Sequence, residues 1–160
     1  MENLRIKRLS VSELPLLTGL FKYKDMDRMI KENTESMENG IIDIFGLFQG
    51  RRLIGELRVK YKSEDEREAI PGKRAYLYAF RILKKEQGKG YGKCLLQEVI
   101  SKLCAAGYSE FTVGVEDDNE RAIHIYKELG FDNIIARKYE TYEGYGYEYS
   151  LYLKTMCFSV

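Results

Sequence analysis

The chain has 160 residues, of which 44% are hydrophobic and 32% charged, and its formal net charge is +1 at pH 7. This length predicts a single domain, residues 1–160, with enough apolar side chains for a packed core. The balanced charge argues against nucleic acid and against a membrane surface as partners, and no apolar run approaches the ~20 residues of a membrane span.

Cysteine usage and the start of the chain indicate a cytoplasmic protein. Cys94, Cys104 and Cys157 are odd in number and lack metal-ligand spacing, so we expect reduced thiols and no metal. Cys94 and Cys104 fall within a predicted helix, where buried thiols behave as small apolar side chains. The polar stretch that follows Met1 does not resemble a signal peptide.

The first forty residues predict a strand followed by two helices. Apolar and polar side chains alternate over residues 4–9. Ser10 and Glu13 have the spacing of a capping box, which predicts a helix from residue 10 to about 21. A second helix is expected over residues 25–38, ended by Asn39 and Gly40. Its methionines would suit either a movable wall over a binding site or an ordinary surface helix.

The rest of the chain predicts antiparallel hairpins on either side of a strand–helix–strand unit. The expected strands are residues 41–48, 53–61, 74–83, 110–116, 134–139 and 147–154, and the expected helices are 90–105 and 120–129. Residues 62–73 are polar and contain Pro71 and Gly72, which predicts an exposed loop. The order β-α-α-β-β-β-α-β-α-β-β predicts an α/β fold, a mixed and mostly antiparallel central sheet with helices on both faces.

A glycine-rich turn lies between the expected strand 74–83 and the helix that follows. Gly88, Gly90 and Gly92 let the backbone approach a ligand without Cβ clashes, and a helix N-terminus favours an anion. Basic side chains surround the turn: Lys84, Lys85, Lys89 and Lys93. The spacing fits neither the Rossmann fingerprint nor the P-loop. A tight strand-to-helix connection without a ligand can have the same composition, so other parts of the chain must decide.

Two motifs together resemble the Gcn5-related N-acetyltransferases (GNAT). The turn contains Gln87-x-x-Gly90-x-Gly92, which matches the family's Q/R-x-x-G-x-G/A pattern. The helix after the fifth strand begins a second match, which reads Asn119-x-x-Ala122-x-x-x-Tyr126-x-x-x-Gly130-Phe131. The resemblance covers essentially the whole chain and is strongest from about residue 75 to 131.

The resemblance implies that acetyl-CoA is the acyl donor and assigns residues to its parts. In the family, the pantetheine arm lies where strands four and five diverge, and the glycine turn holds the pyrophosphate. The residues so assigned to the cofactor are Phe80, Arg81, Ile82, Gln87, Gly88, Lys89, Gly90, Tyr91, Gly92, Lys93, Asn119 and Tyr126. Asn119 also has the expected character of a helix N-cap, and the two roles are compatible.

The same resemblance implies a direct transfer without an acyl-enzyme. A neutral amine attacks the thioester, and a strand-four backbone N–H, which we expect to be that of Ile82, stabilises the oxyanion. Tyr126 is the expected general acid for the leaving thiolate; its alternative role is that of a half-buried core aromatic. His124, two residues earlier on the helix, is expected to face solvent.

The general base is not assigned by the sequence. Histone-type family members carry a Glu eleven residues before the motif Gln, where this chain has Tyr76. Family members that acetylate ribosomal proteins carry a Glu five residues before the motif Asn, where this chain has Gly114. Three other acids remain candidate bases, although each is more typical of a solvated surface carboxylate: Glu56, Glu116 and Glu143. A water chain or an amine that arrives neutral would also serve.

The acceptor is the least defined part of the prediction. The regions that line the acceptor pocket in the family contain tyrosines and acids in this chain. Such side chains would suit a cationic amine through cation–π contacts and charge pairing, but the tyrosines are equally typical of strands. These residues are Tyr76, Tyr78, Tyr142, Tyr145, Tyr147, Glu140, Glu143 and Glu148. We expect an N-acetyltransferase for a primary amine of a small molecule or peptide, working as a monomer or homodimer. The alternatives are a non-catalytic acyl-CoA-binding or regulatory module and a different nucleotide-binding domain.

Overall fold

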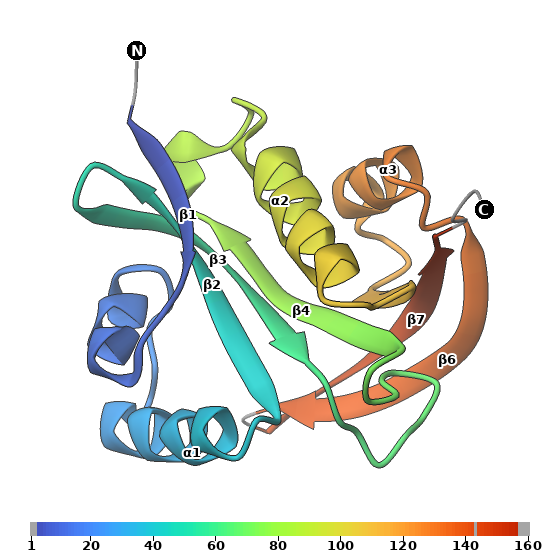
Figure 1. Cartoon of the computed structure of the whole chain (residues 1–160), viewed down its shortest axis with the longest axis horizontal. Helices are drawn as coiled ribbons and strands as arrows, with labels where there is room; N and C mark the ends of the chain where they lie inside the picture. Colours follow the sequence, from blue (N-terminus) through green and yellow to red (C-terminus); the bar gives the residue numbers. More distant parts are fainter. Residues whose placement is uncertain (1–2, 143, 157–160) are drawn as a thin grey trace. The chain divides into compact units, whose positions relative to one another are not determined.

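The computed structural model describes residues 3–142 and 144–156, and the chain forms two compact units (Figure 1). The first unit consists of Met1–Lys60 and Tyr78–Lys102, and the second of Tyr61–Leu77 and Leu103–Val160. Strand β4 (Arg74–Ile82) begins in the second unit and ends in the first.

The first unit is an antiparallel sheet with helical segments packed on it. Its elements are β1 (Leu4–Arg8), the 3₁₀ helix η1 (Val11–Gly19), α1 (Met26–Glu38), β2 (Ile42–Gln49), β3 (Arg52–Lys60), the end of β4, η2 (Lys84–Glu86) and most of α2 (Tyr91–Ala105). β1 pairs with β2, and β2 pairs with β3 in a tight hairpin. The N–H of Leu83, just after β4, bonds to the carbonyl of Ile54 in β3 at 2.9 Å.

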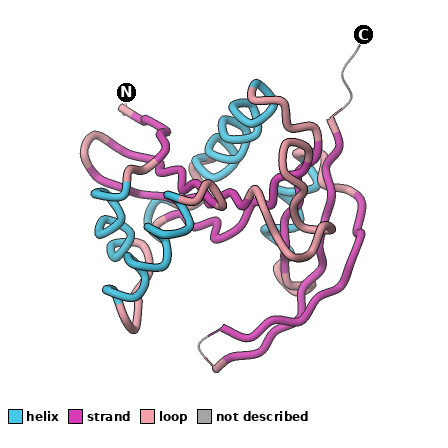
Figure 2. The backbone as a smooth tube through the Cα atoms, turned by 60° about the horizontal axis from the view of Figure 1, so that its bottom comes forward, coloured by secondary structure: helices cyan, strands magenta, loops and turns pink. Residues whose placement is uncertain are grey.

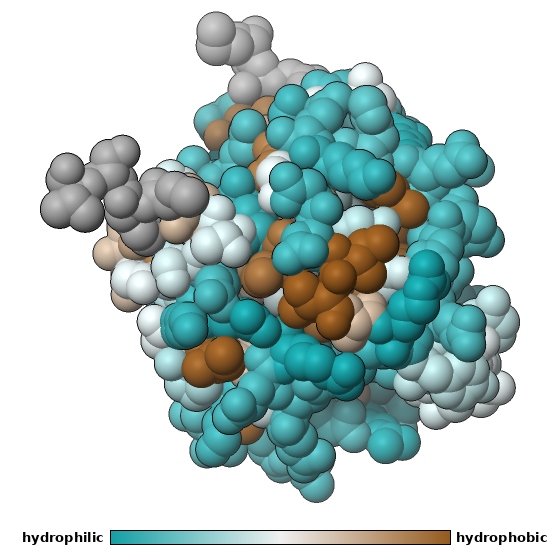
Figure 3. All heavy atoms as spheres, turned by 90° about the vertical axis from the view of Figure 1, so that its right-hand side faces the viewer, coloured by the Kyte–Doolittle hydropathy of each residue, from teal (hydrophilic) through white to brown (hydrophobic). Residues whose placement is uncertain are grey.

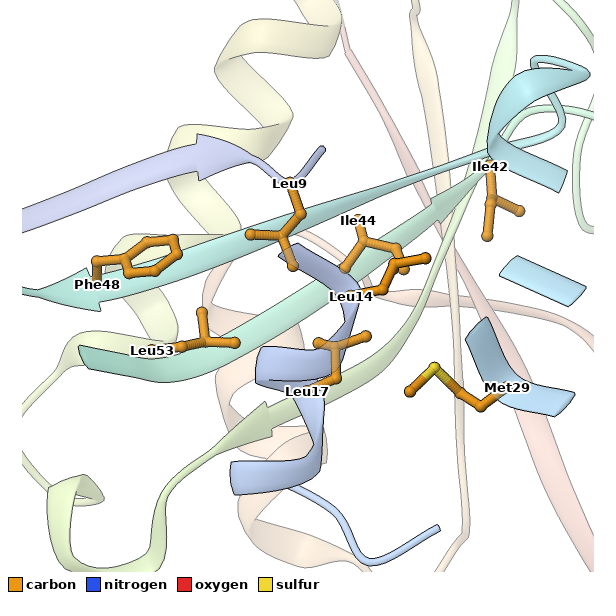
Figure 4. Close-up of a cluster of buried hydrophobic side chains, with 8 residues drawn as sticks. All are labelled: Leu9, Leu14, Leu17, Met29, Ile42, Ile44, Phe48 and Leu53. Atoms are coloured by element: carbon orange, nitrogen blue, oxygen red, sulfur yellow. The ribbon is translucent and has the colours of Figure 1, made fainter. Parts of the chain in front are cut away.

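The apolar core of this unit lies between η1, α1 and the first strands. Figure 4 shows the side chains that form it, which are Leu9, Leu14, Leu17, Met29, Ile42, Ile44, Phe48 and Leu53. The expected capping box is present, because the Ser10 N–H donates to Glu13 Oε1 at 2.9 Å. The segment after it is a 3₁₀ rather than an α-helix and contains Pro15, which has no N–H to donate to an α-helical ladder.

The second unit combines one parallel and two antiparallel strand pairs. Its elements are the start of β4, β5 (Glu110–Val115), α3 (Glu120–Glu128), β6 (Asn133–Tyr142) and β7 (Tyr145–Thr155). β4 runs parallel to β5 from the pair Arg74–Glu110 to the pair Leu77–Val113. β5 and β6 both pair antiparallel with β7, and Figure 2 shows β6 and β7 running side by side as a long hairpin.

The described residues contain seven strands and form the predicted mixed, mostly antiparallel α/β fold. The element order matches the expectation, with the short η2 added before the glycine turn. The face of the molecule in Figure 3 is mainly hydrophilic, with apolar side chains gathered in a few clusters. No helix in the described part of the chain is long and apolar enough to cross a membrane.

Two expectations about exposure are wrong. The loop at residues 62–73 is not exposed throughout, because Glu68 and Ala69 are buried. The helix thiols are not buried either, since Cys94 is exposed and Cys104 is partly exposed. Both errors have one cause. The residue types of a segment do not show which of its side chains other elements will cover in the folded protein. Cys157 lies outside the described residues.

Candidate active site

The glycine turn of the first unit leaves open space next to its backbone. Gly88 and Gly90 have φ values of +80° and +84°, and a Cβ added to either would meet nothing within 4 Å. Left-handed φ values at both positions explain why glycine stands there. The α2 ladder begins with Cys94 N–H bonded to Gly90 C=O at 3.1 Å. The first-turn N–H groups that precede the ladder, from Gly90 to Lys93, therefore lie at the positive end of the helix dipole.

Gly92 is needed for a different reason, which is the close approach of α2 to β4. A Cβ on Gly92 would lie 2.8 Å from Phe80 Cζ and 3.6 Å from Ile82 Cγ1. The side chains of Phe80 and Ile82 therefore pack against the first turn of α2. The contact holds the glycine turn at the end of β4, where the sequence predicts that it grips the cofactor.

The backbone of β4 is distorted immediately before Phe80. Ala79 has φ +50°, and among the described residues it is the one non-glycine in the left-handed region. A non-glycine residue there is strained by about 1–2 kcal/mol, and such distortions in a strand re-aim the groups that follow. The segment Phe80–Ile82, which the sequence assigns to the pantetheine arm, begins at this distortion.

Strand geometry orients the N–H of Ile82. Because Leu83 N–H points to β3, the N–H of the preceding Ile82 points to the opposite edge of β4. The carbonyl of Ile82 accepts a hydrogen bond from Gln87 Nε2 at 2.9 Å. Gln87 thus ties the turn to the strand end, a structural role that the sequence motif alone did not reveal.

One acid lies among the basic residues around the turn. Glu86 is buried, and it accepts from Lys89 Nζ at 2.9 Å and from Arg52 Nη2 at 3.2 Å. The Lys89 hydrogen bond holds the pKa of Glu86 below its usual value, even though burial acts in the opposite direction. Lys84 and Lys85 are exposed, and Lys93 is partly exposed. The turn therefore keeps a positive environment that suits an anionic ligand.

In the second unit, Asn119 and Tyr126 lie on α3. Asn119 Oδ1 accepts from Ala122 N–H at 3.2 Å, which confirms the predicted N-cap. Tyr126 is buried, its ring packs edge-to-face on Phe131 at 5.8 Å, and burial raises the pKa of its hydroxyl. His124 faces solvent as predicted and pairs with Glu128 at 2.7 Å. The cofactor and catalytic roles of Asn119 and Tyr126 stay predictions.

Of the candidate bases, Glu56 differs most from its expectation. It is fully buried rather than solvated, and its carboxylate is held by Arg81 Nη1 at 2.6 Å and Arg58 Nε at 3.1 Å. Both carboxylate oxygens of Glu56 are therefore already occupied as hydrogen-bond acceptors. Glu116 is partly exposed, in keeping with a surface carboxylate, and Glu143 lies outside the described residues.

The arginine partners of Glu56 form a network that the sequence analysis missed. Arg58 also donates from Nη1 to Asn33 Oδ1 at 3.0 Å and from Nη2 to Tyr23 Oη at 2.8 Å. Burial by itself would lower the pKa of Arg58, but Glu56, Tyr23 and Tyr78 together outweigh it and the pKa is raised. Opposite charges two positions apart on one strand share a face, and that spacing was the available signal.

A second polar cluster joins the tyrosines and acids of the second unit. Tyr149 Oη donates to Glu140 Oε1 at 2.7 Å and hydrogen-bonds with Tyr76. Burial raises the pKa of both tyrosine hydroxyls, so both keep their protons at neutral pH. Lys138 Nζ bonds to the buried Glu68 at 2.6 Å. Tyr76 and Glu140 were expected from the sequence, whereas Glu68, Lys138 and Tyr149 were not.

The expected acceptor residues are only partly brought together. Tyr76, Tyr147 and Glu140 belong to this cluster, since Tyr147 Oη donates to Glu140 Oε2 at 3.2 Å. Tyr145 is 66% exposed and stacks on Tyr147, and Glu148 is exposed. In the described ranges, no three His, Cys, Asp or Glu side chains gather in a way that could hold a metal ion.

The first unit thus combines a distorted end of β4 with an open glycine turn at the N-terminus of α2. The model of the Acetyltransferase (GNAT) family matches residues 10–131, which is more than half of the chain. The chain belongs to this family. No curated protein matches it in sequence.

Solved structures show the same fold at low sequence identity. An N-acetyltransferase from Staphylococcus aureus Mu50 is 16% identical with a TM-score of 0.75, covering 96% of this chain and 98% of its own. The ribosomal-protein-S18-alanine N-acetyltransferase of Escherichia coli is 18% identical with a TM-score of 0.74, covering 99% and 97%. YncA of Salmonella typhimurium, solved with its cofactor acetyl-CoA, is 16% identical with a TM-score of 0.72, covering 96% and 94%.

Proposed function

We propose that the chain is an acetyl-CoA-dependent N-acetyltransferase that acetylates a primary amine of a small molecule or peptide. The observation that carries the proposal is the open turn at Gly88 and Gly90, placed at the start of α2 and at the end of β4. A Cβ at either glycine would project into the space that a pyrophosphate needs. Family membership and the acetyl-CoA complex of YncA support the choice of cofactor.

The residues of the first unit fit the donor. Acetyl-CoA supplies an acetyl group activated as a thioester. The first-turn N–H groups from Gly90 to Lys93, together with the nearby lysines, hold the pyrophosphate charge. The backbone of Phe80–Ile82 pairs with the amides of the pantetheine arm as an added strand would. The Ile82 N–H, which points away from β3, donates to the carbonyl oxygen as negative charge develops there.

Tyr126 supplies the proton that the departing thiolate needs. Its buried hydroxyl has a raised pKa and therefore carries its proton at neutral pH. A general acid must hold a proton under working conditions, and such groups contribute ~100- to 10⁴-fold to rate. Glu56 is not proposed as the base, because two arginines hold it. The amine loses its proton to water or arrives neutral.

The test combines acetyl-CoA titration with an assay of CoA release. Calorimetry should show acetyl-CoA binding to the wild-type protein, and an amine panel should contain acceptors that release free CoA. Tyr126→Phe should lower kcat ~100-fold or more while the acetyl-CoA Kd changes little. His124→Ala, on the same helix and 75% exposed at its side chain, is the matched control and should keep full activity.

Each outcome separates one part of the proposal. Unchanged turnover in Tyr126→Phe would show that Tyr126 is not the general acid. Tight acetyl-CoA binding without CoA release across polyamines, aminoglycosides, amino acids and peptide N-termini would favour the non-catalytic acyl-CoA-binding module. Binding of ATP or NAD without any binding of CoA derivatives would favour a different nucleotide-binding domain.

A further inference from the structure

The buried network of the first unit contains more positive than negative charge. Glu56 is fully buried in β3 and accepts one hydrogen bond from Arg58 and one from Arg81, at 3.1 and 2.6 Å. Two guanidinium groups therefore share a single carboxylate. Arginines stay protonated at any physiological pH, so this trio has a net charge of +1. A buried excess charge is costly unless a further group or solvent compensates it.

The two arginines differ in how completely the protein uses them. The side chain of Arg58 is 9% exposed, and all three of its guanidinium nitrogens donate, to Glu56, Asn33 and Tyr23. Its hydrogen bonds join β3 to α1 and to the segment between η1 and α1. Arg58 is thus a structural residue, because each of its guanidinium nitrogens already donates within the protein and its side chain is almost buried.

Arg81 keeps one edge of its guanidinium available. Its side chain is 29% exposed, and Nη1 donates to Glu56. Among the described residues, no acceptor bonds to Nε or Nη2. The ring of Phe21 lies 4.3 Å from the guanidinium carbon and covers one of its faces. Nε and Nη2 form the side-on edge of an arginine, whose parallel N–H groups match the two oxygens of a carboxylate.

Arg81 lies directly before Ile82, whose N–H the proposed function assigns to the oxygen of the reacting thioester. Phe80 and Ile82, its neighbours on β4, direct their side chains to Gly92 in α2. Arg81 contacts Phe21 instead, so its side chain leaves the opposite face of the strand. A group bound to its free edge would be close to the acyl group without competing for the face where α2 begins.

We propose that Arg81 binds a carboxylate of the acceptor, so that the substrates are amines that also carry a carboxylate group. This inference rests on the proposed function and narrows it. It differs from the small cationic amine that the tyrosines and acids of the sequence would suit. The buried salt bridge to Glu56 and the Phe21 ring hold the guanidinium in one orientation, which reduces the entropy lost when a carboxylate binds.

The test compares acceptors that differ only in the carboxylate. The panel contains free amino acids, the corresponding amino acid amides, and amides of peptides that begin with Asp or Glu. We expect kcat/KM to be ~10- to 100-fold higher for an acceptor with a carboxylate than for its amide, as one charge-assisted bidentate contact predicts. The free amino acids and the acidic peptide amides distinguish an α-carboxylate from a side-chain carboxylate.

Substitutions at Arg81 connect this preference to the residue. Arg81→Met should remove the preference by raising KM for the carboxylate acceptors relative to their amides, a ratio in which any change in acetyl-CoA binding cancels. Arg81→Lys keeps a positive charge beside Glu56 but lacks the paired Nε and Nη2 donors, so it should also lose the preference. It provides the test if Arg81→Met fails to fold. Arg28→Met is the matched control, because Arg28 is an exposed arginine of α1 paired with Glu32.

Two results would overturn the inference while leaving the proposed function standing. One is equal acetylation of amino acids and their amides by the wild-type protein. The other is an Arg81→Lys enzyme that folds, binds acetyl-CoA and keeps the full carboxylate preference. Absence of acetyl-CoA binding by the wild-type protein would instead contradict the proposed function itself.

Discussion

Replacing Glu56 with Gln should destabilise the protein far more than the loss of an ordinary salt bridge. Gln has the size of Glu but no charge, so Arg58 would remain buried beside a neutral group. Glu56 accepts two charge-assisted hydrogen bonds, each of which contributes about 1.5–3 kcal/mol. Removing one partner of a buried ion pair costs about 3–5 kcal/mol. The two figures agree, and we expect a loss of about 3–5 kcal/mol.

The measurement is urea unfolding followed by far-UV circular dichroism, with thermal unfolding beside it. In a chain of this size, each kcal/mol lowers Tm by about 2–4 °C, so Glu56→Gln should lower Tm by about 6–20 °C. Glu32→Gln is the control, because Glu32 pairs with Arg28 at 2.7 Å while both side chains are mostly exposed, 61% and 74%. Exposed pairs contribute about 0–1 kcal/mol. If Glu56→Gln cost no more than Glu32→Gln, the account of a buried charge network would be wrong.

Three further predictions test local features of the second unit. Gly114→Ala should cost about 1–3 kcal/mol in thermal unfolding, because its Cβ would lie 2.7 Å from two ring carbons of Tyr149; unchanged stability would show that the ring has room to move. Hydrogen bonding to Arg67 and then to Lys138 lowers the folded-state pKa of Asp65 below its ordinary 3.8. This carboxylate therefore stabilises the fold above that value and loses its contribution as pH falls below it, and Asp65→Asn should flatten the low-pH limb of a stability–pH profile. A limb identical to that of the wild type would exclude this role. Asn119→Ala should lose about 1 kcal/mol of stability and Asn119→Asp should recover it. Acetyl-CoA titration of the stable Asp variant then separates the capping role of Asn119 from a cofactor contact. An unchanged Kd would show that the side chain caps the helix without contacting the cofactor.

The sequence predicted the glycine turn and the helix caps well because their signals are local. Gly88 and Gly90 were expected in a glycine-rich turn, and both have the left-handed φ values that residues other than glycine rarely adopt. Asn119 was expected as an N-cap, and its side chain accepts a hydrogen bond from the N–H of Ala122, three residues later. The capping box of Ser10 and Glu13 spans the same short distance. Contacts within a few residues depend little on the rest of the fold, so pattern and spacing are enough to predict them.

The sequence predicted the burial of charged side chains poorly, and Glu56 is the clearest case. A glutamate within a strand is expected to face solvent, because lone buried carboxylates are costly. Here β3 is buried along almost its whole length, so alternation along the strand does not separate an inner from an outer face. Arg81, which neutralises Glu56 from β4, lies 25 residues away, and local patterns do not indicate a partner at that distance.

Residue chemistry and local spacing therefore determined the turn, the caps, the element order and the family resemblance. The tertiary structure decided which charges are buried together and which donor groups remain available. Arg58 and Arg81 are the same residue type, each on a strand, and no sequence pattern distinguishes their roles. Packing distinguishes them, because the surroundings of Arg58 use all of its nitrogens, whereas those of Arg81 leave Nε and Nη2 at the surface. Burial depends on all the elements that cover a side chain, and these come together only in the folded chain.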